Sequence, residues 1–241
     1  MGTKLNLMET VNIQYKFTLP DQSSEVFDLQ FDAKELVLIN NMPSILPSWT
    51  DLYYYQCPNC VIDPERYNYC PLSANLVSIV RRFKGLLSFD KVTIDVSTNE
   101  RIVSQKTTIQ RGISSLMGLI IATSGCPHTS FFRPMARFHL PLSSKEETIY
   151  RATSMYLLAQ YFLNKEKKQA DLELEGLKAI YENAQIVNTS IAERLRAASD
   201  TDSSVNAITL LDMYAQSLPF AISDSLENIK YLFAPFLKSE D

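Results

Sequence analysis

Glycine is scarce in this sequence, at only 6 of 241 residues, and no glycine-rich loop is present. Because loops that cradle nucleotide phosphates depend on glycine, the sequence predicts no nucleotide site of that kind. The chain also lacks the G-x-S-x-G turn of serine hydrolases and the HExxH helix of zinc proteases. These absences remove the signatures of several large enzyme classes and favour a protein that is not an enzyme.

An excess of positive charge and long apolar runs are absent as well. The chain has 23 Lys and Arg against 27 Asp and Glu, a net charge of -4. Nucleic-acid binding normally needs a basic face, so we expect no nucleic-acid partner. The longest apolar run, residues 116–122, is far shorter than a membrane span of about 20 residues. No signal peptide is visible either, so we expect a cytoplasmic protein that does not bind membranes.

A hydrophobic period of two, which is typical of β-strands with one buried face, dominates the first part of the chain. It occurs in residues 11–19, 26–32 and 35–39, and again in residues 92–96 with a return over residues 101–107. The pattern predicts an antiparallel meander in which the second hairpin joins the first sheet.

Helical periods interrupt and then replace this pattern. From Pro71 onward, apolar residues recur every three or four positions, and a second helix should end at Gly125. Ser144 and Glu147 have the spacing of a capping box at the start of a third helix. The apolar stripe from Leu177 to Ala198 predicts a long helix packed in a bundle, with a homodimer seam through the helical region as the alternative.

The predicted fold class is therefore α+β. We predict a β-rich region with one helix over residues 1–107, including a cysteine-rich loop at 53–72, and a helical bundle over residues 108–241. The two regions should pack as one unit.

The chain contains four cysteines, three of them in residues 53–72, here called the cysteine segment. Cys57 and Cys60 form a C-x-x-C pair, Cys70 follows after nine intervening residues, and Cys126 lies far downstream. In a reducing compartment, clustered cysteines bind metal more often than they form disulfides. A C-x-x-C turn presents two thiolates to one ion, and tetrahedral zinc needs four ligands.

The spacing therefore predicts a structural zinc site of four cysteines, with His128 as an alternative ligand. Cys70 and Cys126 each precede a proline that suits the first turn of a helix, where the helix N-terminus would stabilise thiolate. None of the four lies on a recognisable core face, where an inert buried cysteine is expected. An iron–sulfur cluster, as in an electron-transfer or sensor protein, and unligated thiols are the alternatives.

Both histidines of the chain lie within residues 126–139, together with two arginines. Arg133 and Arg137 are one helical turn apart and suit the binding of a carboxylate or phosphate, so with His139 they form a candidate anion site. An enzyme that acts on an anionic substrate through this cluster is a further alternative, using Cys126, His128, Arg133 and Arg137. The competing interpretation is that the arginines pair with the acidic residues at 146 and 147 and stabilise the bundle.

Five stretches carry a resemblance to a known family: QCPNC, CPLSANLVSIVRRF, SSLMGLIIATSGCPH, RPMARFHLP and TIYRATSMYLLAQYF. They look like the signature blocks of a family of uncharacterised bacterial proteins, described only as a domain of unknown function, and cover roughly residues 50–200. The resemblance implies a bacterial cytoplasmic origin, but it implies no activity. It marks the four cysteines together with His128, Arg133, Arg137 and His139. The sequence as a whole favours a binding or regulatory protein.

Overall fold

The computed structural model describes residues 9–39, 43, 45–83, 86–198, 204–209, 211–212, 215 and 226–237. In chain order its elements are β1 (Thr10–Thr18), β2 (Ser24–Asp32), η1 (Ser48–Thr50), α1 (Pro71–Arg82), β3 (Lys91–Ser97), β4 (Ile102–Thr108), α2 (Ile109–Thr123), η2 (Ser130–Phe132), α3 (Arg133–Arg137), α4 (Lys145–Lys165), α5 (Glu175–Ala198), η3 (Lys230–Phe233) and α7 (Ala234–Leu237). Residues 204–209 are also helical. The predicted α+β class is confirmed.

The four strands form one antiparallel sheet in the order β2-β1-β3-β4. Tyr15 of β1 pairs with Phe27 of β2 on one side and with Val96 of β3 on the other, so the two hairpins are joined through β1 and β3 as predicted. Alternate residues point to one buried face because the side-chain period of a strand is two. The buried residues on this face are Ile13, Tyr15, Phe17, Phe27, Leu29, Phe31, Val92, Ile94 and Val96.

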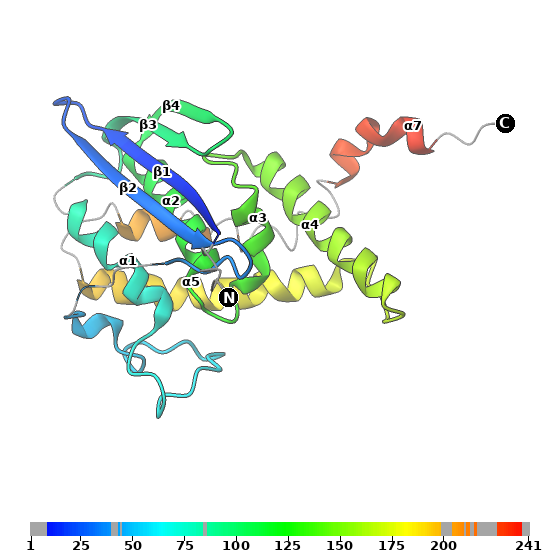
Figure 1. Ribbon diagram of the computed structural model, residues 1–241, viewed down its shortest axis with the longest axis horizontal. Coiled ribbons are helices and arrows are strands. Elements are labelled where there is room, and N and C mark those ends of the chain that lie inside the picture. The colour runs from blue at the N-terminus through cyan, green and yellow to red at the C-terminus, as the bar shows by residue number, and fades with distance from the viewer. Residues whose placement is uncertain are drawn as a thin grey trace, which may run out of the picture.

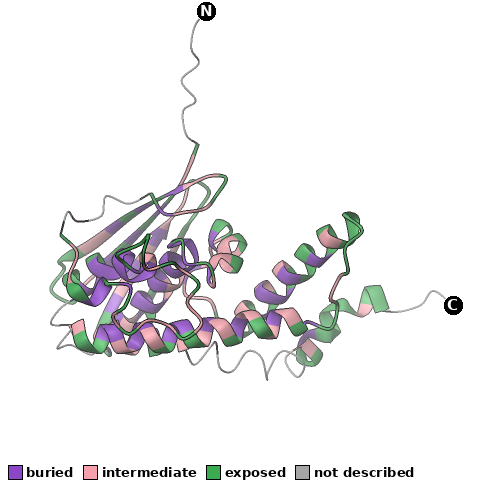
Figure 2. Ribbon diagram, turned by 90° about the horizontal axis from the view of Figure 1, so that it is seen from below, coloured by how far each residue is buried: buried purple, intermediate pink, exposed green. Residues whose placement is uncertain are grey.

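Helices α1 and α2 cover the buried face of the sheet, and α5 runs along the other side of this helical layer (Figure 1). Figure 2 shows that burial is concentrated where the sheet and these helices meet. The close approach of α2 depends on Gly112, because a Cβ atom there would lie 2.0 Å from Cδ1 of Ile94. One hydrophobic core thus includes residues from both the strands and the helices.

The predicted strand at residues 35–39 is wrong. Leu36 has a positive φ of 50°, and this segment makes only an isolated bridge between Leu38 and Phe31. The Leu38 amide also donates to the carbonyl of Thr123 at the end of α2, at 2.9 Å. The apolar side chain is therefore buried by a loop that ties β2 to α2, which a short apolar run in the sequence does not distinguish from a strand.

The predicted helix signals in the second half of the chain are confirmed. Ser144 accepts a hydrogen bond from the Glu147 amide, and the Glu147 carboxylate accepts one from the Ser144 amide, which completes the capping box of α4. The stripe on α5 packs in the protein's own core, with Leu177, Val187 and Leu195 all buried. A homodimer through the helical region stays a prediction.

Candidate functional site

The four cysteines lie around one small cavity of about 20 Å³, here called the cysteine cavity. His128, Pro127 and apolar side chains from the cysteine segment, α1 and α5 complete its lining. All four cysteines are free, and the other three thiols each interact electrostatically with Cys57. Thiols that are far apart in the sequence, before α1 and after α2, therefore face a common space.

Each cysteine is positioned by local backbone structure. The Cys60 amide donates to the Cys57 carbonyl at 2.9 Å, which closes the C-x-x-C turn. Cys70 is the N-cap of α1, and Gly125, with a φ of 89°, ends α2 and redirects the chain at Cys126. Cys70 and Cys126 are buried in the hydrophobic core, so the prediction that no cysteine lies on a core face is wrong for these two.

Neighbouring segments hold the C-x-x-C turn in place. The Asn59 side chain donates to Oδ1 of Asn183 on α5 at 2.8 Å. His128 Nε2 hydrogen-bonds to the Asn59 carbonyl oxygen. This hydrogen bond helps to hold the turn. It leaves both predicted ligand sets open, because a histidine that ligates a metal through one ring nitrogen commonly hydrogen-bonds to a backbone carbonyl through the other.

Burial favours the protonated form of two of these thiols, those of Cys57 and Cys126. Burial raises the pKa of Cys57 to about 11, although a hydrogen bond with the Ser190 side chain opposes the increase. Burial also raises the pKa of Cys126, more than the backbone amides of His128 and Thr129 lower it. The predicted stabilisation of thiolate at Cys126 by a helix N-terminus is therefore wrong, since Pro127 begins a turn and no helix starts there.

The cysteine cavity is not a preformed metal site. Within the described part of the chain, no group of three or more His, Cys, Asp or Glu side chains is arranged so that it could hold a metal ion. Ligation of zinc or of an iron–sulfur cluster by the four thiols stays a prediction.

Arg194 anchors the chain that leads into the cysteine segment. This residue of α5 is buried, and its guanidinium donates to three backbone carbonyls that precede the segment's C-x-x-C turn. The acceptors are Trp49 at 2.9 Å, Asp51 at 2.7 Å and Leu52 at 3.0 Å. Arg194 was not predicted from the sequence, although its position three residues after Ile191 places a charged residue on the buried stripe of α5, a signal that could have identified it.

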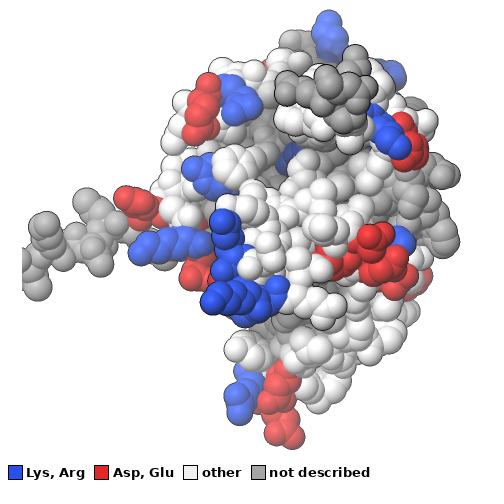
Figure 3. Space-filling model, turned by 90° about the vertical axis from the view of Figure 1, so that its right-hand side faces the viewer, with Lys and Arg blue, Asp and Glu red and all other residues white. Residues whose placement is uncertain are grey.

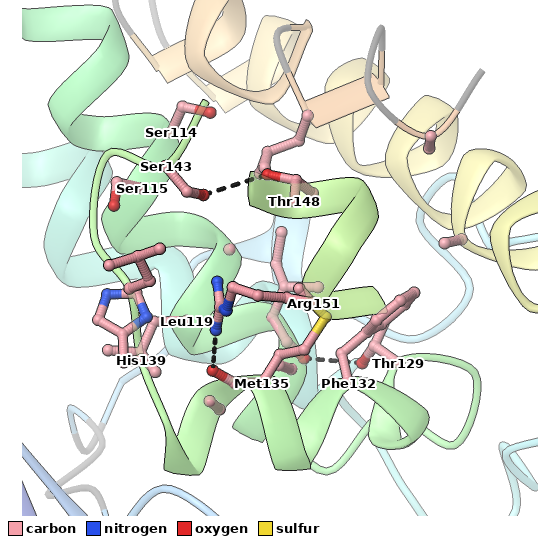
Figure 4. A pocket seen from close by; sticks show the side chains of 18 of the residues that line it. Ser114, Ser115, Leu119, Thr129, Phe132, Met135, His139, Ser143, Thr148 and Arg151 are labelled. Atoms are coloured by element: carbon pink, nitrogen blue, oxygen red, sulfur yellow. Dashed lines mark hydrogen bonds between the residues drawn. The ribbon is translucent and has the colours of Figure 1, made fainter. Parts of the chain in front are cut away.

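A second, larger cavity of about 210 Å³ lies among α2, α3, α4 and α5 and is here called the large cavity. Figure 4 shows the Arg151 side chain reaching across it from α4, between His139 and Phe132. Arg151 Nη2 donates to the carbonyls of Met135 at 2.7 Å and Phe138 at 3.0 Å. No feature of the sequence of α4 marked Arg151 as part of a site.

The predicted anion cluster is split by the fold. His139 lines the large cavity and hydrogen-bonds to the Tyr15 hydroxyl at 2.6 Å. Burial, and secondarily the charge of Arg151, lowers the pKa of His139 to about 3, so this histidine carries no positive charge at neutral pH. Arg137 is exposed and lies over the ring of Phe138, and neither Arg137 nor Arg133 lines either cavity.

The competing interpretation of the two arginines is not supported either. None of the ion pairs among the described residues involves Arg133 or Arg137. Arg133 Nε is buried without a hydrogen-bond partner in the described part of the chain. Figure 3 shows positive and negative side chains interspersed over one largely uncharged face of the molecule.

The fold and the two cavities define an α+β protein with a thiol-lined cavity and a separate, mainly apolar one. A family model described as a domain of unknown function, DUF6901, matches residues 13–234. The chain belongs to this family, in agreement with the resemblance to an uncharacterised family. Searches of curated proteins and of solved structures returned no match. None of the described helices combines the length and the apolar composition that crossing a membrane requires.

Proposed function

We propose that this protein binds one zinc ion through Cys57, Cys60, Cys70 and Cys126, and that it serves a binding or regulatory role. The ion would join the cysteine segment to the helical part of the chain. The proposal is supported by one observation above all, that the four thiols line a single cavity of about 20 Å³. A cavity of at least about 10–15 Å³ admits one water-sized sphere, so this space suits a single small occupant.

A zinc ion suits the cysteine cavity better than a buried water does. A buried water needs two to four hydrogen-bond partners, whereas thiols are weak donors and weak acceptors. His128 Nε2 is already engaged with Asn59. Four thiolates in tetrahedral geometry are a common structural ligand set for zinc.

Binding requires the thiols to move closer together, because the described residues hold no ready-made ligand set. Cys70 and Cys126 are buried in the core, while Cys57 and Cys60 are only half-buried. The C-x-x-C turn is therefore the part that closes onto the ion. Since the pKa values of Cys57 and Cys126 are raised by burial, zinc must displace thiol protons, and its affinity should increase with pH.

Metal analysis of protein purified under anaerobic, reducing conditions tests the proposal. We expect about one equivalent of zinc per chain, and less than about half an equivalent of any metal contradicts a metal site. C126S should lose the metal. H128Q should keep it, whereas loss of zinc in this variant would assign His128 as a ligand. A brown protein containing iron and sulfide would replace zinc with an iron–sulfur cluster.

Cobalt substitution gives an independent readout of the ligands. Cobalt(II) bound by four thiolates shows intense sulfur-to-cobalt charge-transfer absorption, which decreases as thiolates are removed. We expect this absorption to weaken in each single Cys→Ser variant and to persist in H128Q. Equal spectra for the wild type and C70S would exclude Cys70 from the site.

A further inference from the structure

We propose that the large cavity binds a monocarboxylate whose apolar body has the size of a single ring. This inference does not depend on the zinc proposal, because the residues that carry it lie outside the cysteine cavity.

The charge of the lining favours an anion. Among the described residues, Arg111 and Arg151 line the cavity and no Asp or Glu does, in a chain whose net charge is -4. Arg111 is exposed, whereas Arg151 is half-buried, so the cavity holds one desolvated cation with a second at its rim. One interior positive charge matches a ligand with one negative charge.

The guanidinium of Arg151 is held in place and keeps part of its donor capacity. Both of its described hydrogen bonds use Nη2, toward the backbone carbonyls of Met135 and Phe138. No carboxylate among the described residues lies within ion-pair distance of it. A guanidinium has five N–H donors in a planar fork, which leaves donors available for a ligand carboxylate.

The other titratable groups near Arg151 do not neutralise it. Burial lowers the pKa of Arg151, and the nearby Glu147 carboxylate opposes this only in part. The Glu147 carboxylate is engaged by the Ser144 amide at 2.7 Å. Tyr181 stays protonated because burial raises its pKa, and His139 is neutral. A bound carboxylate would therefore supply a counter-charge in direct contact with the guanidinium, which no described residue does.

The size and the walls of the cavity define the rest of the ligand. Its volume of about 210 Å³ exceeds the roughly 150 Å³ of an apolar cavity that takes benzene, and leaves room for a carboxylate. Leu119, Phe132 and Met135 supply apolar and aromatic walls. A phosphate ester would bring a second charge, for which the described lining residues include no second buried cation and the sequence has no glycine-rich loop.

Calorimetric titration of the full-length protein with three probes tests the proposal. We expect phenylacetate to bind at least about tenfold more tightly than phenylacetamide, which cannot form charge-assisted hydrogen bonds with Arg151, and than phenyl phosphate, whose second charge has no buried partner among the described lining residues. In R151Q, phenylacetate and phenylacetamide should bind alike. R137Q is the matched control, since Arg137 lies outside the cavity, and it should bind as the wild type does.

A second variant keeps the test decisive if R151Q folds poorly after losing its bonds to α3. A184L adds volume to a buried wall residue on α5 without touching Arg151, and should reduce phenylacetate binding at least about tenfold. The proposal is overturned if the amide binds the wild type as tightly as the acid does. It is also overturned if R137Q weakens binding as much as R151Q, or if A184L binds phenylacetate as the wild type does.

Discussion

Replacing Arg194 with leucine should strongly destabilise the protein. The substitution removes three hydrogen bonds from a buried guanidinium to the carbonyls of Trp49, Asp51 and Leu52. Each buried acceptor left without a donor costs about 1–3 kcal/mol, and partial access of water to the half-freed loop reduces the total. We therefore expect R194L to lower the free energy of unfolding by about 3–5 kcal/mol.

The assay is urea unfolding followed by circular dichroism and by tryptophan fluorescence. Trp49 is the only tryptophan in the chain and is buried, so its fluorescence reports directly on the segment that Arg194 anchors. In R194L the fluorescence transition should precede the loss of helical signal, because the anchored segment is released first.

R196L is the matched control on the same helix. Arg196 is exposed, and its ion pair with Glu193 lies at the surface, so its loss should change stability by less than about 0.5 kcal/mol. Equal stabilities of R194L and R196L, or a loss below about 1 kcal/mol in R194L, would refute the anchoring argument.

Two further predictions concern the core and the large cavity. G112A should destabilise the protein by about 1–3 kcal/mol, because its Cβ would collide with the buried side chains of Ile94 and Phe17. G118A is the control and should be neutral or stabilising, because its Cβ would lie 3.5 Å from the nearest side chain, that of Leu211. Thermal unfolding compares the two, and similar melting temperatures would contradict the close packing of α2 on the sheet. For His139, burial lowers the pKa to about 3 from an unfolded value near 6.5, so between these pH values the unfolded chain binds a proton that the folded protein does not. The free energy of unfolding should therefore fall as the pH decreases below about 6.5, by up to about 2 kcal/mol at pH 5. Urea unfolding of H139N should not show this contribution to the loss of stability. An equal loss of stability in H139N and in the wild type would contradict the role of His139.

The sequence predicted those parts of the fold that depend on local periodicity. Alternation at Ile13, Tyr15 and Phe17 and the stripe beginning at Leu177 correspond to a buried sheet face and a buried helix face. Residues 35–39 carried the same kind of apolar pattern but form a loop, because a single bridge at Leu38 buries the side chain without a strand. Short apolar runs specify burial more reliably than they specify backbone conformation.

The sites were predictable only where the residue type itself suggested chemistry. Cysteine spacing directed attention to the thiols, although spacing alone did not indicate that burial would keep Cys57 protonated. The large cavity had no such signal, because its lining comes from helices that are adjacent only in the folded chain. For Arg133 and Arg137 the residue type misled. Their helical spacing suggested an anion site, but neither side chain lines either cavity in the fold.

The anchoring of Leu52 by Arg194 spans 142 positions of the chain and affects how the protein is made. At about 5–20 residues per second, a ribosome needs roughly 7–30 s to add that much polypeptide. For most of this interval Cys57, Cys60 and Cys70 have been synthesised, while the part of α5 that carries Arg194 has not. The nascent thiols are therefore open to oxidants and to competing metals for many seconds, and a supply of reductant during translation should increase the yield of correctly assembled protein.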